Sequence, residues 1–133
     1  KKNKIKGSII NLSSMYGIIS QDPEIYKKTN KSENIIYSAI KGGINTFSKQ
    51  LAVIYGKHDI RVNTICPGGV INEKDYKKLD IDKNFRKNYF QKSPIKRFAT
   101  TYDVACATIF LSSDASKYIT GTNLTLDGGW TAL

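Results

Sequence analysis

The fold is decided by the stretch Tyr37-Ser-Ala-Ile-Lys-Gly-Gly-Ile-Asn-Thr-Phe-Ser-Lys-Gln-Leu-Ala-Val-Ile-Tyr55 and by the Ile60-Arg-Val-Asn-Thr-Ile-Cys66 that follows it. Apolar residues recur in the first part at helical spacing, and Gly56 just beyond it suits a C-cap. The second part is a short apolar run that ends at Pro67-Gly68-Gly69, which is typical of a buried strand. A helix that leads directly into a buried strand indicates a parallel crossover.

Similar elements lie on both sides of this unit. Residues 5–13 and 119–126 are predicted to be strands, and a second helix is predicted to begin at Tyr102 and end at Leu111. Asp103 suits the positive end of that helix, and Ser112-Ser113-Asp114 closes it. The order strand, helix, strand, helix, strand predicts an α/β fold with three parallel strands and flanking helices. Residues 72–98 are predicted to be a loop with one or two short helices.

Composition narrows the class of protein. The 133 residues, 40% of them hydrophobic, are expected to form one small domain, without a signal peptide or a membrane span. Cys66 and Cys106 lie in apolar stretches without metal-ligand spacing, so we expect buried free thiols, no metal and a reducing cytoplasm. The net charge of +10 comes from scattered lysines, which favours a solvated surface over a nucleic-acid or membrane partner.

Candidate chemistry is concentrated at Ser14, Tyr37 and Lys41. A tyrosine and a lysine four residues apart on a helix point the same way, so the ammonium can lie near the phenol. We expect the positive charge to lower the pKa of the phenol toward the working range. Ser14 follows the first strand, and its hydroxyl can bond a substrate oxygen. The three side chains suit proton transfer to or from an alcohol oxygen.

Five ordered motifs resemble the short-chain dehydrogenase/reductase family, in its single-domain branch. They are Gly7-Ser-Ile-Ile-Asn-Leu-Ser-Ser14, Tyr37-Ser-Ala-Ile-Lys41-Gly-Gly, Ile60-Arg-Val-Asn63-Thr-Ile-Cys-Pro67-Gly68, Asp103-Val-Ala through Asp114, and Ile119-Thr-Gly121 through Gly129. The resemblance implies an NAD(P)-dependent oxidoreductase that interconverts a carbonyl and an alcohol. It implies that Ser14 binds the substrate oxygen, Tyr37 is the general acid/base and Lys41 assists it.

The resemblance also implies a cofactor site for NAD or NADP. Lys41 would hold the nicotinamide ribose, and Val70 would offer backbone groups to the carboxamide. Asn72 stands where many members have threonine, whereas Asn63 is expected to be structural. The implied cofactor-binding residues are Tyr37, Lys41, Pro67, Gly68, Val70 and Asn72.

These motifs correspond to the C-terminal half of a Rossmann-type, doubly wound domain. We therefore expect residues 1–133 to be a partial NAD(P)-binding domain whose Gly-rich phosphate-binding half is absent from this sequence. The strand that ends at Ser14 is then expected to expose an edge. A catalytically silent fragment is the alternative for the isolated chain. The resemblance further implies a small-molecule substrate and a homo-oligomer, a dimer or tetramer.

The 22 residues between Ser14 and Tyr37 exceed the commonest family spacing by about ten. This insertion resembles reductases of bacterial surface-glycan and flagellin-modification sugar pathways, which implies a sugar or sugar-nucleotide substrate. Its Tyr26, Lys27, Lys28 and Lys31 can meet an anionic or sugar-like group. Two alternatives remain open: a solvated, mobile lid without a chemical role, and a 3-oxoacyl-carrier-protein reductase.

A few conspicuous residues are predicted to be structural. His58 is expected in a surface turn, and Asp127-Gly128-Gly129 in a turn that ends a strand. Packing is expected for three tyrosines and for Trp130, which would close the core edge or a subunit contact. The tyrosines are Tyr76, Tyr89 and Tyr118.

Overall fold

The structure, a computed structural model, describes residues 6–72 and 82–132. Its main strands are β1 (Gly7–Leu12), β2 (Ile60–Pro67) and β5 (Asn123–Leu126), and its α-helices are α1 (Ile35–Gly56), α2 (Lys83–Lys92) and α3 (Thr101–Ser112). Among its 3₁₀ turns are η1 (Met15–Gly17), η2 (Pro23–Tyr26) and η5 (Trp130–Ala132).

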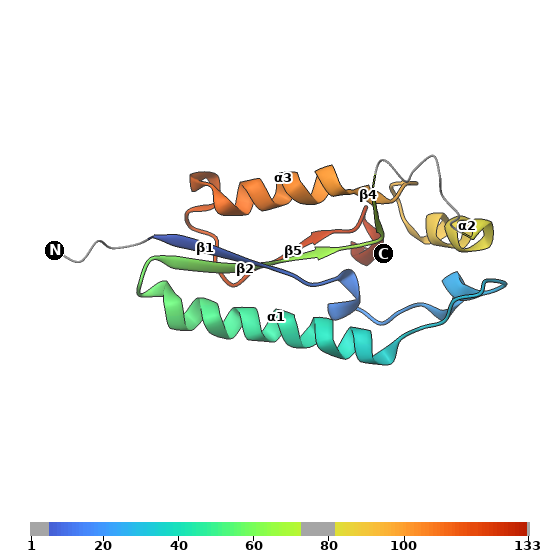
Figure 1. Cartoon of the computed structure of the whole chain (residues 1–133), viewed down its shortest axis with the longest axis horizontal. Helices are drawn as coiled ribbons and strands as arrows, with labels where there is room; N and C mark the ends of the chain where they lie inside the picture. The colour runs from blue at the N-terminus through green and yellow to red at the C-terminus, as the bar shows by residue number, and fades with distance from the viewer. Residues whose placement is uncertain (1–5, 73–81, 133) are drawn as a thin grey trace.

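The three main strands form a parallel sheet in the order β1-β2-β5. The register places Gly7 opposite Ile60 and Leu12 opposite Ile65, so β1 and β2 end near the same rim. Helix α1 covers one face of the sheet and α3 the other (Figure 1). The predicted α/β fold with three parallel strands and flanking helices is therefore confirmed.

A second, two-stranded parallel sheet was not predicted from the sequence. It pairs β3 (Val70–Ile71) with β4 (Ala99–Thr100). Strands of two residues carry no alternation that a sequence pattern can reveal. Their pairing joins the segment after β2 to the start of α3.

Helix α1 begins two residues before the predicted start. Asn34 is its N-cap, and the Asn34 Oδ1 accepts a hydrogen bond of 3.0 Å from the Tyr37 backbone N–H. The prediction that Gly56 caps the C-terminus is wrong, because Gly56 is the last helical residue and Lys57 is the cap in a right-handed conformation. The left-handed residue of this turn is Asp59, with φ of 57°.

The third strand is shorter than predicted, because residues 119–122 are a connecting segment. Buried Asn63 on β2 holds that segment: its amide donates to the Ile119 carbonyl (2.9 Å) and its Oδ1 accepts from the Thr122 N–H (3.1 Å). These bonds fit the structural role expected for Asn63, since they satisfy a buried polar side chain.

The aromatic core lies at the rim where β2 ends. It contains Met15, Ile25, Tyr89, Phe98 and Trp130. The Tyr89 ring lies 4.8 Å from Phe98 and 4.7 Å from Trp130, centroid to centroid, so the packing role expected for Tyr89 and the core-edge position of Trp130 are seen.

Two expectations about burial are wrong in part. Cys66 is buried, but Cys106 is exposed on α3. Tyr118 is fully exposed and does not pack. His58 is exposed, as expected for a turn, and Tyr76 lies outside the described residues. Sequence hydropathy does not specify which face of α3 meets the sheet, because this helix is apolar around most of its circumference.

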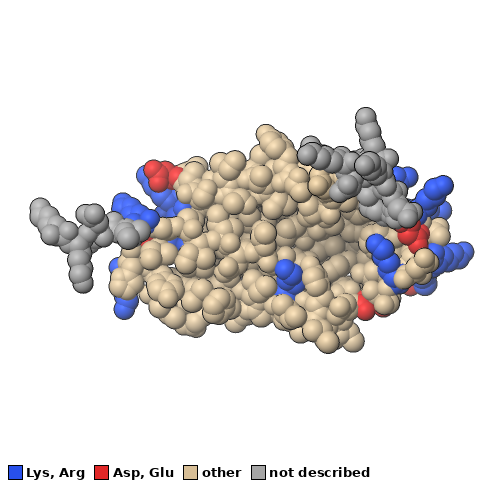
Figure 2. Space-filling model, viewed as in Figure 1, with Lys and Arg blue, Asp and Glu red and all other residues tan. Residues whose placement is uncertain are grey.

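The face in Figure 2 carries its lysines and arginines at the two ends of the molecule, and its middle has few charges. In the described part of the chain, β1 forms an edge of the sheet, as predicted. Large apolar side chains are exposed on α1, among them Ile35, Ile36 and Val53. No helix among the described residues is long and apolar enough to cross a membrane.

Helix α1 is fastened to the end of β1 by hydrogen bonds along one side. The Asn11 amide donates to the Ser48 hydroxyl, and the Ser13 hydroxyl donates to the Lys41 carbonyl, both at 2.8 Å. The Lys41 ammonium donates to the Leu12 carbonyl at 3.1 Å. These contacts fix the position of Lys41, measured along the axis of α1, relative to the end of β1.

The turn after β1 also touches α1 directly. The Asn45 amide donates to the Gly17 carbonyl at 3.0 Å. A Cβ at Gly17 would lie 2.7 Å from the carbonyl carbon and oxygen of Lys41. Only glycine permits this approach, because the clashing atoms belong to backbone that cannot rotate away.

Gly17→Ala is expected to lower the free energy of unfolding by about 2 kcal/mol, since the added methyl group must push η1 away from α1. Urea or thermal melts measure the change. Gly43→Ala is the matched control: nothing lies within 4 Å of a Cβ there, and the variant should gain about 0.5–1 kcal/mol. Equal effects of the two substitutions would contradict the close approach.

The start of α3 makes stability depend on pH. Thr100 and Asp103 form a capping box, and hydrogen bonds from the Arg97 guanidinium (2.7 and 3.1 Å), then from the Thr100 N–H, hold the pKa of Asp103 well below its ordinary value. Because the pKa of Asp103 is lower in the folded than in the unfolded protein, its ionised carboxylate stabilises the folded state at any pH above the unfolded pKa of about 3.9. This stabilisation is lost as the pH falls below that value toward the folded pKa.

Asp103→Asn is therefore expected to lower the free energy of unfolding by about 1 kcal/mol at pH 7 and to flatten the loss of stability between about pH 5 and 2. Denaturant melts across this range measure both effects. Glu33→Gln, on an exposed side chain, is the charge-matched control. An unchanged acid limb in Asp103→Asn would show that this carboxylate does not govern acid stability.

Candidate active site

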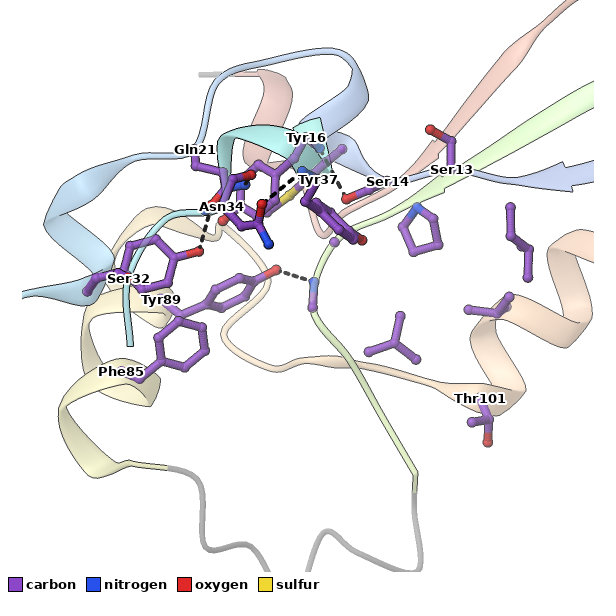
Figure 3. A pocket seen from close by; sticks show the side chains of 18 residues that line it. Ser13, Ser14, Tyr16, Gln21, Ser32, Asn34, Tyr37, Phe85, Tyr89 and Thr101 are labelled. Atoms are coloured by element: carbon purple, nitrogen blue, oxygen red, sulfur yellow. Dashed lines mark hydrogen bonds between the residues drawn. The ribbon is translucent and has the colours of Figure 1, made fainter. Parts of the chain in front are cut away.

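A cavity of about 660 Å³ opens at the rim where β1 and β2 end. Its walls come from the ends of these strands, the insertion after β1, the start of α1, and parts of α2 and α3 (Figure 3). Ligands of parallel α/β sheets bind at such a rim, and this volume suits a small organic molecule.

Ser14 and Tyr37 line this cavity together. Ser14 is buried and caps η1, where its hydroxyl accepts a hydrogen bond of 3.2 Å from the Tyr16 N–H. Tyr37 lies in the first turn of α1 and is 40% exposed. The 22 residues between them form a segment that begins and ends at this rim. Ser14 and Tyr37 therefore line the same cavity despite the insertion.

Lys41 lies one turn beyond Tyr37 on α1. Its ammonium is 5.6 Å from the centroid of the Tyr37 ring, the close approach that the four-residue spacing predicts. The hydrogen bond to the Leu12 carbonyl holds the ammonium at the end of β1. Ser14 and Tyr37 thus share one cavity, whereas Lys41 lies beside Tyr37 and is not among the residues that line the cavity.

Of the predicted cofactor-binding residues after β2, Pro67, Gly68 and Val70 line the cavity. Asn72 is exposed, directly after β3, and is not among the cavity-lining residues. The segment is held from behind: the Gly69 N–H donates to the Tyr89 hydroxyl at 2.7 Å. A Cβ at Gly69 would meet the Phe98 ring at 2.7 Å, so this backbone lies tightly against the aromatic core.

Three further tyrosines stand around the cavity: Tyr16, Tyr26 and Tyr89. Burial raises the pKa of each, and for Tyr16 the neighbouring Tyr26 adds to the effect. All three therefore remain neutral phenols at physiological pH. They can donate hydrogen bonds and present ring faces, but they are poor proton carriers.

The insertion is anchored to α2. The Asn84 amide donates to the Lys28 carbonyl (2.8 Å), and the Asn88 amide donates to the carbonyls of Ile25 (3.3 Å) and Lys27 (3.0 Å). An ion pair of 3.0 Å joins Asp22 to Lys92. Both segments contribute to one wall of the cavity.

The four insertion residues singled out in the sequence lie in three different places. Tyr26 lines the cavity. Lys27 and Lys28 line a separate groove, and Lys27 pairs with Glu24 at 2.7 Å. The Lys31 ammonium lies 4.7 Å from the centroid of the Phe85 ring.

Several cavity residues were missed by the sequence analysis, notably Gln21, Asn34 and Phe85. Asn34 carries a recognisable signal, because asparagine directly before a helical pattern is a preferred N-cap. Gln21 and Phe85 carry none, since a polar loop residue and an aromatic in a charged segment are common on any surface. Only the tertiary contact between the insertion and α2 assigns them to the site.

Comparison with known proteins places this geometry in a family. Residues 1–131 match the family model described as Enoyl-(Acyl carrier protein) reductase. The chain is 36% identical to Glucose 1-dehydrogenase 2 of Bacillus subtilis, over 98% of this chain and 46% of the relative. It is 36% identical to Post-translational flagellin modification protein A of Campylobacter coli, over 97% of this chain and 48% of the relative.

A crystal structure of a short-chain dehydrogenase from Leptospira borgpetersenii with bound NAD+ superposes with a TM-score of 0.84 at 35% identity. The match covers 98% of this chain and 46% of that chain. The chain therefore spans about half the length of the relatives it matches. On the family match, the fold and the ordered motifs, the chain belongs to the short-chain dehydrogenase/reductase family.

Proposed function

We propose that the whole protein is an NAD(P)-dependent oxidoreductase that interconverts an alcohol and a carbonyl, with Ser14, Tyr37 and Lys41 at its reacting centre. The observation that carries this proposal is the convergence of Ser14 and Tyr37 on one cavity, with the Lys41 ammonium 5.6 Å from the Tyr37 ring. The nicotinamide supplies or accepts the hydride, and these residues handle the proton.

In the direction of oxidation, the Tyr37 phenolate takes the proton of the substrate hydroxyl as the hydride leaves the same carbon, which leaves a carbonyl. The positive charge of Lys41 stabilises negative charge on the Tyr37 oxygen. Ser14 donates a hydrogen bond to the substrate oxygen and so fixes its position. The reduction runs through the same contacts in reverse.

The residues present fit the nicotinamide end of the cofactor. The side chains of Pro67 and Val70 offer apolar contact, and Gly68 and Gly69 line the cavity beside them. The Gly-rich turn that holds a pyrophosphate is not found in these 133 residues. We propose NAD or NADP as the cofactor, a proposal that the NAD+ bound in the Leptospira structure supports.

We propose a sugar or sugar alcohol as the substrate class, and the lining of the cavity supports this choice. Aromatic faces from Tyr16, Tyr26, Phe85 and Tyr89 stand among hydroxyl and amide groups, a combination that suits a ring with both C–H faces and hydroxyls. The name of the Bacillus relative supports a sugar, and that of the Campylobacter relative supports a step in flagellin modification; a role in surface-glycan (polysaccharide) biosynthesis is proposed on the sequence resemblance alone.

The rival is a 3-oxoacyl-carrier-protein reductase. The description of the matching family model, Enoyl-(Acyl carrier protein) reductase, supports a carrier-protein-bound acyl substrate. Turnover of D-glucose and D-arabinitol with NAD+ and NADP+, compared with reduction of an acetoacetyl thioester by NADH and NADPH, separates the two. We further propose that the whole protein is a cytoplasmic homo-oligomer. The exposed apolar side chains of α1 support a contact between subunits on that helix.

Tyr37→Phe in the whole protein is expected to lower kcat by about 10²–10⁴-fold, because phenylalanine cannot exchange the proton. Cofactor affinity should change little, which NADH fluorescence titration measures. Tyr55→Phe, an exposed tyrosine on the same helix, is the matched control and should retain full turnover. Unimpaired turnover by Tyr37→Phe would refute the assignment.

A further inference from the structure

Gln21, in the insertion, uses all four hydrogen-bonding positions of its side chain. Its Nε2 donates to the Asn34 carbonyl (2.9 Å) and to the Ser38 hydroxyl (3.1 Å). Its Oε1 accepts from the Asn34 N–H (3.1 Å) and from the Tyr26 hydroxyl (3.2 Å). A glutamine amide offers two donors and two acceptors, so the side chain is fully satisfied in a single orientation.

Two of these bonds hold both backbone groups of Asn34, the N-cap of α1. The Asn34 side chain in turn accepts the hydrogen bond from the Tyr37 N–H. Gln21 therefore acts on the backbone of Tyr37 through one intermediate residue. The first turn of a helix has no intrahelical partners for its N–H groups, so its position depends on such contacts.

The bond to Tyr26 connects the same side chain to the wall of the cavity. The Tyr26 ring lies 5.8 Å from the Phe85 ring, and Asn84 and Asn88 on α2 hold the backbone on both sides of this contact. Gln21 thus lies between a wall braced by α2 and the helix that carries Tyr37. Figure 3 shows Gln21 and Asn34 near Tyr37 among the residues that line the cavity.

We propose that Gln21 is a positioning residue for the reaction, which holds Tyr37 in register with the substrate wall through Asn34 and Tyr26. The inference rests on the proposed role of Tyr37. It gives the insertion a role in the chemistry, because the longer segment supplies the brace for the helix start. Through Tyr26, the same segment sets where a bound ring lies relative to the phenol oxygen.

The test compares Gln21→Met, which keeps the length but removes all four bonds, with Gln21→Glu, which keeps the two acceptor positions. Gln91→Met, an exposed glutamine on α2, is the matched control. With D-glucose and D-arabinitol as probes, kcat of Gln21→Met should fall about ten- to hundredfold while the KM for cofactor stays within about twofold. The kcat of Gln21→Glu should lie between those of Gln21→Met and the wild type, and the kcat of Gln91→Met should equal that of the wild type.

Hydrogen–deuterium exchange gives a readout that needs no substrate. Amides of residues 34–38 should exchange about tenfold faster in Gln21→Met, which loses both bonds to the Asn34 backbone. The acceleration should be smaller in Gln21→Glu, which keeps the acceptor for the Asn34 N–H, and the exchange rate should be unchanged in Gln91→Met. Unchanged exchange in Gln21→Met, or faster exchange with an unchanged kcat, would overturn the proposal. Tyr37→Phe, measured alongside, distinguishes failure of the proposed function from failure of the Gln21 proposal. Full turnover by Tyr37→Phe would refute the proposed function, whereas the exchange data would still decide whether Gln21 holds the start of α1.

Discussion

The site depends on the contact between the end of β1 and one side of α1. Polar side chains from the strand end bond backbone and side-chain groups of the helix, and the Gly17 turn lies against the Lys41 backbone. A parallel strand and its crossover helix are otherwise free to slide along each other by a fraction of a turn. Hydrogen bonds form only when the donor–acceptor distance is correct to within a few tenths of an ångström, so these contacts prevent α1 from sliding along β1. Ser14 and Lys41 are fixed relative to each other as a consequence.

The tyrosines around the cavity have different environments, and the differences divide their chemistry. Tyr89 is buried and Tyr16 and Tyr26 are partly buried. Burial raises the pKa of each, so they serve as neutral hydrogen-bonding groups and packing surfaces. Tyr37 is more exposed and has an ammonium beside its ring. Of the four phenols at the cavity, Tyr37 is therefore the one with a cation beside its ring, which supports the role proposed for it.

The insertion and α2 form a wall that neither could form alone. Two apolar side chains of the insertion, Met15 and Ile25, are fully buried and anchor it to the core. Asparagine side chains on α2 supply donors to the insertion carbonyls, which loop geometry would otherwise leave to water. The cost of ordering the longer segment is offset by these bonds and by the aromatic contact between Tyr26 and Phe85.

The sequence by itself determined the parallel α/β order, the long helix α1, the buried strand β2 and the approach of Lys41 to Tyr37. These features rest on local periodicity and on fixed geometry within one element, which a single stretch of sequence contains. It also indicated Ser14 and the backbone at Pro67 and Gly68, because strand ends of a parallel sheet share a rim. The short pairing of β3 with β4, the exposure of Cys106 and the connecting role of residues 119–122 were decided by tertiary structure. So were the cavity positions of Gln21 and Phe85. Each of these features depends on which distant segment packs against the residue. The free energy of such a contact depends on both segments together, so the local sequence of either one cannot predict it.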